Sequence, residues 1–372
     1  MDQDNYPADV VIDNARVFDG ETVQPGLFSV GITGSAIEFV NPMAPQAAPT
    51  APSRAKTVID AEGRFLMPGL IDCHVHLIDF TNVDDDAKMA AYLEIEELKQ
   101  LVGFLSSGVT SIKSVGDPED HIFQTRDSIA RGSLRGPRLF VTGPCFTGRD
   151  SHPATTVYGR NPWARKRAAI ETDSPAMARD TIRRLAERRV DAIKIIHHGG
   201  CRCAGSKPYF LKFEAFGWDT QMYKVPRTVL EAIIDEALLC GLKATAHTFD
   251  QHEAIDALEA GVDGLEHGVV NQRISDDRLI ELLKKNNATY VPTLWLVGLK
   301  ETYANLKQVA DAGVKVALGS DSFVGYGAFG NNTLVELERM VEAGLEPLNV
   351  LRMATKNSAD LLRNNRLGLI AL

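Results

Sequence analysis

Short apolar runs alternate with longer amphipathic segments along most of the chain. Apolar residues recur at helical spacing in the intervals, for example over 177–188 and 229–238. Strands that alternate with helices predict a parallel sheet, and eight such units are typical of a (β/α)8 TIM barrel, which commonly takes about 250 residues. The active site of such a barrel is expected at the carboxyl ends of its strands. The candidate strands are 70–76, 109–115, 138–143, 191–197, 242–247, 262–267, 289–293 and 314–320.

The first residues have a different pattern. The segments 9–18 and 27–33 are apolar or alternating, and 44–53 is rich in proline and alanine. These features predict short strands joined by turns and by a loop. We therefore expect an α/β chain with a β segment over 1–66 and a barrel over 67–364.

Composition excludes several classes of partner. Of the 372 residues, 44% are hydrophobic, and the net charge is −9, which argues against nucleic acid as a partner. No apolar run approaches the length of about 20 residues that spans a bilayer, and the first residues lack the basic and apolar regions of a signal peptide. The five cysteines show no framework spacing, so we expect a cytoplasmic protein in which Cys201 and Cys203 are free thiols.

Candidate metal ligands stand at the ends of the apolar runs. His74 and His76 are two residues apart in the first run, and such residues point to the same face of a strand. His247 and His267 end two later runs, and Asp321 follows the last one. Nitrogen and oxygen ligands of this kind suit zinc or a similar divalent metal.

Lys194 lies inside an apolar run, where a buried ammonium is costly and tends to lose its proton. A neutral amine can react with carbon dioxide to give a carbamate, whose two oxygens can bridge two metals. The alternative is a lysine paired with Asp191 or Asp321. The four histidines and the aspartate at the other run ends favour the carbamate.

Five motifs, in this order, resemble the amidohydrolase superfamily, in the subset whose two metals are bridged by a carboxylated lysine. The resemblance covers nearly the whole chain. The motifs are PGLIDCHVH at 68–76, IKII at 193–196 before a Gly-Gly pair, ATAH at 244–247, GLEHG at 264–268 and LGSDS at 318–322.

The resemblance implies a set of roles. His74, His76 and Asp321 would hold one metal, and His247 and His267 the other. Carboxylated Lys194 and a water or hydroxide would bridge the two ions, which are expected to be zinc. Asp321 would also take the proton from the nucleophile and pass it to the leaving nitrogen.

The implied activity is hydrolysis of an amide or peptide-like C–N bond in a small molecule, such as an N-acyl amino acid or a dipeptide. The nearest resemblance is to the imidazolonepropionase-related and prolidase-like members. Three further histidines are candidates for substrate binding. His152 lies in a segment that approximates the T-G-G-H of relatives, while His197 and His198 follow Lys194 and could instead stabilise their loop. The aromatic-rich segment 199–224 could be a lid or a loop with its own core.

Two alternatives stay open. A mononuclear deaminase or cyclic amidase of the same superfamily usually lacks the lysine and often has H-x-x-E after the fifth strand, which His247 to Asp250 only approximates. A non-catalytic metal-binding or assembly protein is the alternative of another class. Relatives continue beyond the segment that corresponds to 365–372 with strands of a β-sandwich. We therefore expect an apparently incomplete N-terminal sandwich with a truncated return, and a homo-oligomer.

Overall fold

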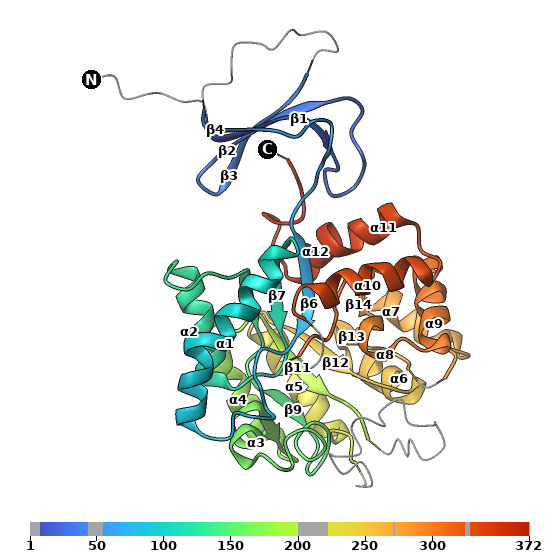
Figure 1. Ribbon diagram of the computed structural model, residues 1–372. Coiled ribbons are helices and arrows are strands. Elements are labelled where there is room, and N and C mark those ends of the chain that lie inside the picture. The colour runs from blue at the N-terminus through green and yellow to red at the C-terminus, as the bar shows by residue number, and fades with distance from the viewer. Residues whose placement is uncertain (1–7, 44–54, 200–221, 271, 324–327, 372) are drawn as a thin grey trace. The chain divides into compact units, whose positions relative to one another are not determined.

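The computed structural model describes residues 8–43, 55–199, 222–270, 272–323 and 328–371, and it divides into two compact units (Figure 1). The small unit comprises residues 1–69 and 355–372, and the large unit comprises residues 70–354. The Cys201–Cys203 pair and most of the expected lid lie outside the described residues. Among the described residues, no helix combines the length and the apolar character needed to cross a membrane.

The small unit is built on a five-stranded sheet with the order β3-β2-β1-β4, in which β5 also pairs with β1. Neighbouring strands β1, β2 and β3 are antiparallel, whereas β4 and β5 run parallel to β1. In the part of this unit that the structure describes, the strands form one sheet, so a two-layered sandwich is not seen there. The strands are β1 (Ala8–Val17), β2 (Phe28–Thr33), β3 (Ala36–Pro42), β4 (Ala55–Asp60) and β5 (Phe65–Leu66).

The last residues of the chain pack onto this sheet. Ile370 is buried in one cluster with Ala15, Val17 and Val30, and its backbone N–H donates to the carbonyl of Asp19 over 2.9 Å. The return of the chain is therefore part of the core of the small unit.

The large unit has a mixed α/β architecture in which all strand pairs are parallel. One sheet has the order β10-β9-β11-β12-β13-β14, and a second has the order β6-β7-β8. The strands are β6 (Leu70–Val75), β7 (Val109–Ser114), β8 (Arg138–Val141), β9 (Cys145–Thr147), β10 (Ala169–Glu171), β11 (Ala192–Ile196), β12 (Lys243–His247), β13 (Gly264–Glu266) and β14 (Thr289–Val291).

Helices lie outside these strands (Figure 1). They turn their apolar faces inward, as α5 does with Val229, Leu230 and Ile233. The helices of the large unit are α1 (Asp86–Ser106), α2 (Glu119–Ala130), α3 (Pro162–Ala168), α4 (Pro175–Glu187), α5 (Arg227–Leu239), α6 (Gln251–Ala260), α7 (Asp277–Lys285), α8 (Leu294–Val297), α9 (Lys300–Asp311), α10 (Asn331–Glu342) and α11 (Pro347–Arg352). A π-helical turn (Met353–Asn357) leads into α12 (Ser358–Leu361).

The expected eighth strand at 314–320 is not a regular strand. Its pairing with each neighbour is confined to one isolated bridge, Tyr290 with Val316 and Val75 with Ser322, so no ladder of successive pairs forms. It nevertheless lies between β14 and β6, because Ala317 donates to the carbonyl of Tyr290 and Cys73 donates to that of Leu318. The sequence therefore predicted the position of this segment but not its conformation.

Candidate active site

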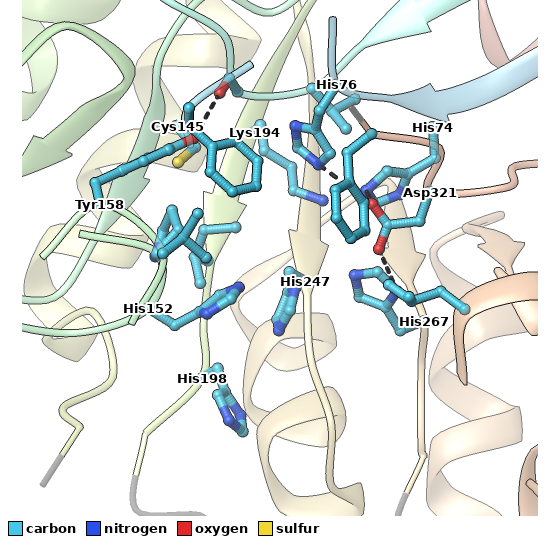
Figure 2. A pocket seen from close by; sticks show the side chains of 18 of the residues that line it. His74, His76, Cys145, His152, Tyr158, Lys194, His198, His247, His267 and Asp321 are labelled. Atoms are coloured by element: carbon cyan, nitrogen blue, oxygen red, sulfur yellow. Dashed lines mark hydrogen bonds and ion pairs between the residues drawn. The ribbon is translucent and has the colours of Figure 1, made fainter. Parts of the chain in front are cut away.

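One pocket at the carboxyl ends of the parallel strands collects all six expected metal ligands (Figure 2). Lys194 lies within β11 and His247 ends β12, while His76 and His267 directly follow β6 and β13. Parallel strands present their carboxyl ends at one edge, so residues that are far apart in the sequence meet there. His152 and His198 also line this pocket.

Asp321 lies between the first two histidines. Its Oδ1 is 3.3 Å from Nε2 of His76 and 3.5 Å from Nε2 of His74, and the three side chains form a group that could hold a metal ion. Asp321 has a φ of +56°, which is uncommon for a residue with a side chain. Burial alone would raise the pKa of this carboxyl, but the neighbouring His74 and His76 outweigh it and lower the pKa below its usual range.

Glu266 orients the ring of His74 through a contact with Nδ1. Its Oε2 lies 2.8 Å from Nδ1 of His74, and its Oε1 accepts from Nζ of Lys113 over 3.1 Å. All three side chains are buried. An ionised carboxylate only accepts hydrogen bonds, so the proton of His74 is on Nδ1 and the lone pair of Nε2 faces Asp321. Such a carboxylate behind a histidine is the usual support of a metal ligand.

The second pair of imidazoles is also buried. The rings of His247 and His267 are 4.4 Å apart between centroids, and Nδ1 of His267 lies 2.7 Å from the hydroxyl of Thr293. Burial is the main cause that holds the pKa of both rings well below the usual value, although the charge of Asp321 acts in the opposite direction on His267. They are therefore neutral near pH 7, and neutral imidazole is the form that binds a metal.

Lys194 is buried, and in the described part of the chain its Nζ has no hydrogen-bond partner. Asp191, its expected partner in the ion-pair alternative, instead accepts from the backbone N–H of Val141 over 2.7 Å. Burial lowers the pKa of Lys194 to about 8, although the charges of Glu266 and Asp321 act in the opposite direction. A substantial fraction of this amine is therefore neutral at mildly alkaline pH.

The three candidate substrate-binding histidines differ in their placement. The ring of His152 lies 4.8 Å from that of His247, and its Nδ1 is 2.7 Å from the hydroxyl of Thr156. His198 lines the pocket as well, with Nδ1 directed at Glu253. His197 is not among the residues that line the pocket, because its Nε2 points to Asp256 at 2.8 Å.

An apolar wall faces the histidines. The ring of Phe80 contacts those of Tyr158 and Phe323, at centroid distances of 5.8 and 5.9 Å. The hydroxyl of Tyr158 donates to the carbonyl of Gly116, so it is turned away from apolar neighbours. Other apolar lining residues are Val115, Pro153, Val157, Ile196, Phe249 and Leu296.

Sequence reasoning missed the residues behind the histidines, among them Lys113, Glu253 and Glu266. The available signal was a charged residue inside an apolar run, as for Glu266 in β13 and Lys113 in β7. Buried charges need partners, but the sequence does not say which partners they find.

A parallel α/β fold with a group of histidine, lysine and aspartate side chains at its strand ends is typical of metal-dependent hydrolases. The sequence model of the amidohydrolase family matches residues 65–372, so the chain belongs to the amidohydrolase family. It is a hydrolase that acts on C–N bonds.

The chain is also similar to individual proteins. The imidazolonepropionase of Thermoanaerobacter pseudethanolicus is 23% identical over 351 residues, which are 85% of this chain and 76% of the relative. A Xaa-Pro dipeptidase crystallised with methionine in its active site has a similar fold, with a TM-score of 0.74, 23% identity and coverage of 97% and 91%. Molinate hydrolase has a TM-score of 0.76, 20% identity and coverage of 98% and 87%.

Proposed function

We propose that the chain hydrolyses an amide or peptide-like bond of a small molecule, such as a dipeptide or an N-acyl amino acid, at a centre that holds two divalent metal ions, with zinc as the first candidate. The observation that carries the proposal is the convergence of His74, His76, Lys194, His247, His267 and Asp321 on one pocket.

The donor set fits such a centre. Nζ of Lys194 and Nε2 of His247 are buried without hydrogen-bond partners among the described residues. Leaving buried polar atoms unpaired is costly. A cation bound at Nε2 of His247 would remove this cost for His247, and carbamylation of Lys194 would supply two ligand oxygens. In this assignment His74, His76 and Asp321 would hold one ion, His247 and His267 would hold the other, and carboxylated Lys194 would be shared by both.

The metal ions would lower the pKa of a shared water and polarise the carbonyl of the substrate. Asp321 would accept the proton of the attacking water and deliver it to the leaving nitrogen. His152 lies across the pocket from Asp321 and is assigned a hydrogen bond to the substrate (Figure 2). The apolar wall of Phe80, Tyr158 and Phe323 would hold an apolar group of the substrate and exclude water.

The strands that carry these residues are proposed to form one closed (β/α)8 barrel. Two hydrogen-bonded junctions support this. The segment 314–322 bridges β14 to β6, and the backbone N–H of Asp191, just before β11, donates to the carbonyl of Val141 at the end of β8 over 2.8 Å. Closure would fix the distances between strand ends and preorganise the site.

The deaminase alternative receives less support. Asp250 would have to take the place of the H-x-x-E carboxylate, but its side chain caps α6 and accepts from the backbone N–H of Glu253 over 2.9 Å. Asp250 is not among the residues that line the pocket, whereas Lys194 is. The position of Lys194 in the pocket therefore favours a two-metal hydrolase over a mononuclear deaminase.

Metal analysis and a substrate panel test the proposal together. Zinc-, manganese- and cobalt-loaded protein should contain two ions per chain and hydrolyse at least one dipeptide or N-acyl amino acid. His247→Ala should lower both metal content and turnover. His252→Ala, an exposed histidine five residues along the chain in α6, should retain the metal content. Metal-loaded protein that cleaves none of the panel, or a metal content that is unchanged in His247→Ala, would contradict the proposal.

A further inference from the structure

A buried carboxylate holds His198 in place. Glu253, on the first turn of α6, accepts from the backbone N–H groups of Gly199 and Phe249, each over 2.9 Å, and of Asp250 over 3.2 Å. Both of its oxygens lie 3.1 Å from Nδ1 of His198. Glu253 and His198 are each 1% exposed, so this arrangement is shielded from water.

This arrangement determines which ring nitrogen carries the proton. Burial raises the pKa of Glu253, but the hydrogen bonds from His198 and from the backbone outweigh it, and the net pKa is below the usual value. Glu253 is therefore ionised and can only accept. Nδ1 of His198 therefore donates to it, which leaves Nε2 as the ring nitrogen available to a ligand.

Nε2 of His198 is a buried ring nitrogen that is open to a ligand in the pocket. Among the described residues it has no hydrogen-bond partner, and His198 lines the pocket. Its ring lies 5.6 Å from that of His247 and 6.3 Å from that of His152 (Figure 2). A substrate group that is one or two bonds away from a carbonyl held near His247 can reach Nε2 of His198.

The charge around His198 selects the type of donor. The carboxylate of Glu253 places a negative charge directly behind the ring of His198. The nearby cations Lys224 and Arg227 are both paired with Asp256, at 2.8 and 2.9 Å, and neither lines the pocket. A positively charged donor is therefore favoured over a neutral one, and an anionic group is disfavoured.

We infer that Nε2 of His198 accepts a hydrogen bond from a free α-amino group on the acyl part of the substrate. The inference rests on the proposed function and narrows it, because it selects dipeptide-like substrates with a free amino terminus over N-acyl amino acids. His198 is a specificity-determining residue, and Glu253 is the positioning residue that sets its tautomer.

Three matched substrates test the inference. Alanyl-, lactoyl- and propionyl-phenylalanine differ only in whether the α-carbon of the acyl group carries an ammonium, a hydroxyl or a hydrogen. An unpaired buried acceptor makes the site reject the substrate without a donor, so kcat/KM should fall in that order, by about 10–100-fold from alanyl to propionyl. In His198→Phe the three values of kcat/KM should become similar, mainly because the value for the alanyl substrate falls.

Two further variants separate this role from a structural one. His198→Gln retains an acceptor oxygen and should keep part of the preference. His197→Phe removes a neighbouring buried imidazole that does not line the pocket, and it should retain the wild-type order of substrates. The inference is overturned if wild-type protein cleaves the propionyl substrate as fast as the alanyl one, or if His198→Phe keeps the preference.

A binding measurement distinguishes failure of the inference from failure of the proposed function. Alanine hydroxamate and propionohydroxamate bind metal centres and differ only in the amino group. By calorimetry on metal-loaded wild-type protein, alanine hydroxamate should bind about tenfold or more tightly than propionohydroxamate. In His198→Phe this ratio of affinities should be less than about threefold. The affinity ratio can be measured even if the protein hydrolyses no amide. A lack of amide hydrolysis would refute the proposed function but not the inference about His198. Equal affinities in wild-type protein overturn the inference.

Discussion

Glu266→Gln offers a sharp test of how the metal site is oriented. The wild-type carboxylate accepts from Nδ1 of His74 at 2.8 Å and from Nζ of Lys113 at 3.1 Å. In the variant, the amide oxygen can still accept from Lys113, but the amide nitrogen then faces His74 and donates to Nδ1. The proton of His74 moves to Nε2, which is the atom that faces Asp321 and would bind the metal.

Two losses of different size follow. Removing the partner behind a metal-binding histidine typically lowers metal affinity about 10–100-fold, or about 1.4–2.7 kcal/mol. The variant also leaves the ammonium of Lys113, which is 2% exposed, without the carboxylate that accepts its hydrogen bond. Breaking a buried ion pair costs about 3–5 kcal/mol, and because the amide oxygen is retained we expect a loss of about 3 kcal/mol. A domain with about 5–15 kcal/mol of stability still folds.

A double variant tests the cause of both losses. Lys113→Met combined with Glu266→Gln removes the unpaired ammonium and should recover most of the lost stability, as measured by denaturant unfolding of the metal-free protein. It should also recover part of the metal affinity, as measured by competition with a chelator, because the amide oxygen, no longer held by Lys113, can accept from Nδ1 of His74 and restore the tautomer. If Glu266→Gln binds metal as tightly as wild-type protein, or if the double variant recovers stability but no metal affinity, the tautomer argument is wrong.

The remaining predictions concern the chemistry of the site. Lys194→Ala should lose turnover and regain part of it with acetate or propionate; no regain would argue against a bridging carboxylate. Wild-type protein in ¹³C-bicarbonate should show a carbamate carbon signal that Lys194→Ala lacks, and its absence would count against carboxylation. Asp321→Asn should lower kcat by at least about 10²-fold, with a smaller loss of metal; near-native turnover with a full metal load would refute its role as a base.

The sequence predicted the meeting of the six residues because two simple rules were enough. Alternation along a strand places His74 and His76 on one face, and parallel strands bring their carboxyl ends to one edge. The roles of these residues as ligands stay predictions. Strands β9 and β10, with three residues each, were not among the expected strands.

The residues behind the histidines could not be predicted, because they depend on register. Lys113 and Glu266 are 153 positions apart, and the contact exists only if β7 and β13 place both side chains at the same level. His198 and Glu253 are 55 positions apart and meet because β11 ends opposite the first turn of α6. A shift of one residue in either strand would turn these side chains to the other face. No local pattern records such a register.

The two carboxylates show how the fold arranges lone pairs. Glu266 and Glu253 each lie beside Nδ1 of a buried imidazole, so in each ring, of His74 and of His198, Nε2 is the nitrogen left for another partner. Lone pairs that converge on one pocket repel each other unless a positive partner lies between them. His74 faces its lone pair towards Asp321, which adds further negative charge, so a metal cation is the partner that balances this side. Apart from Asp321, no carboxylate is among the described residues that line the pocket, and in our inference a single N–H donor is the partner of Nε2 of His198. One device thus serves both metal binding at His74 and, in our inference, substrate selection at His198.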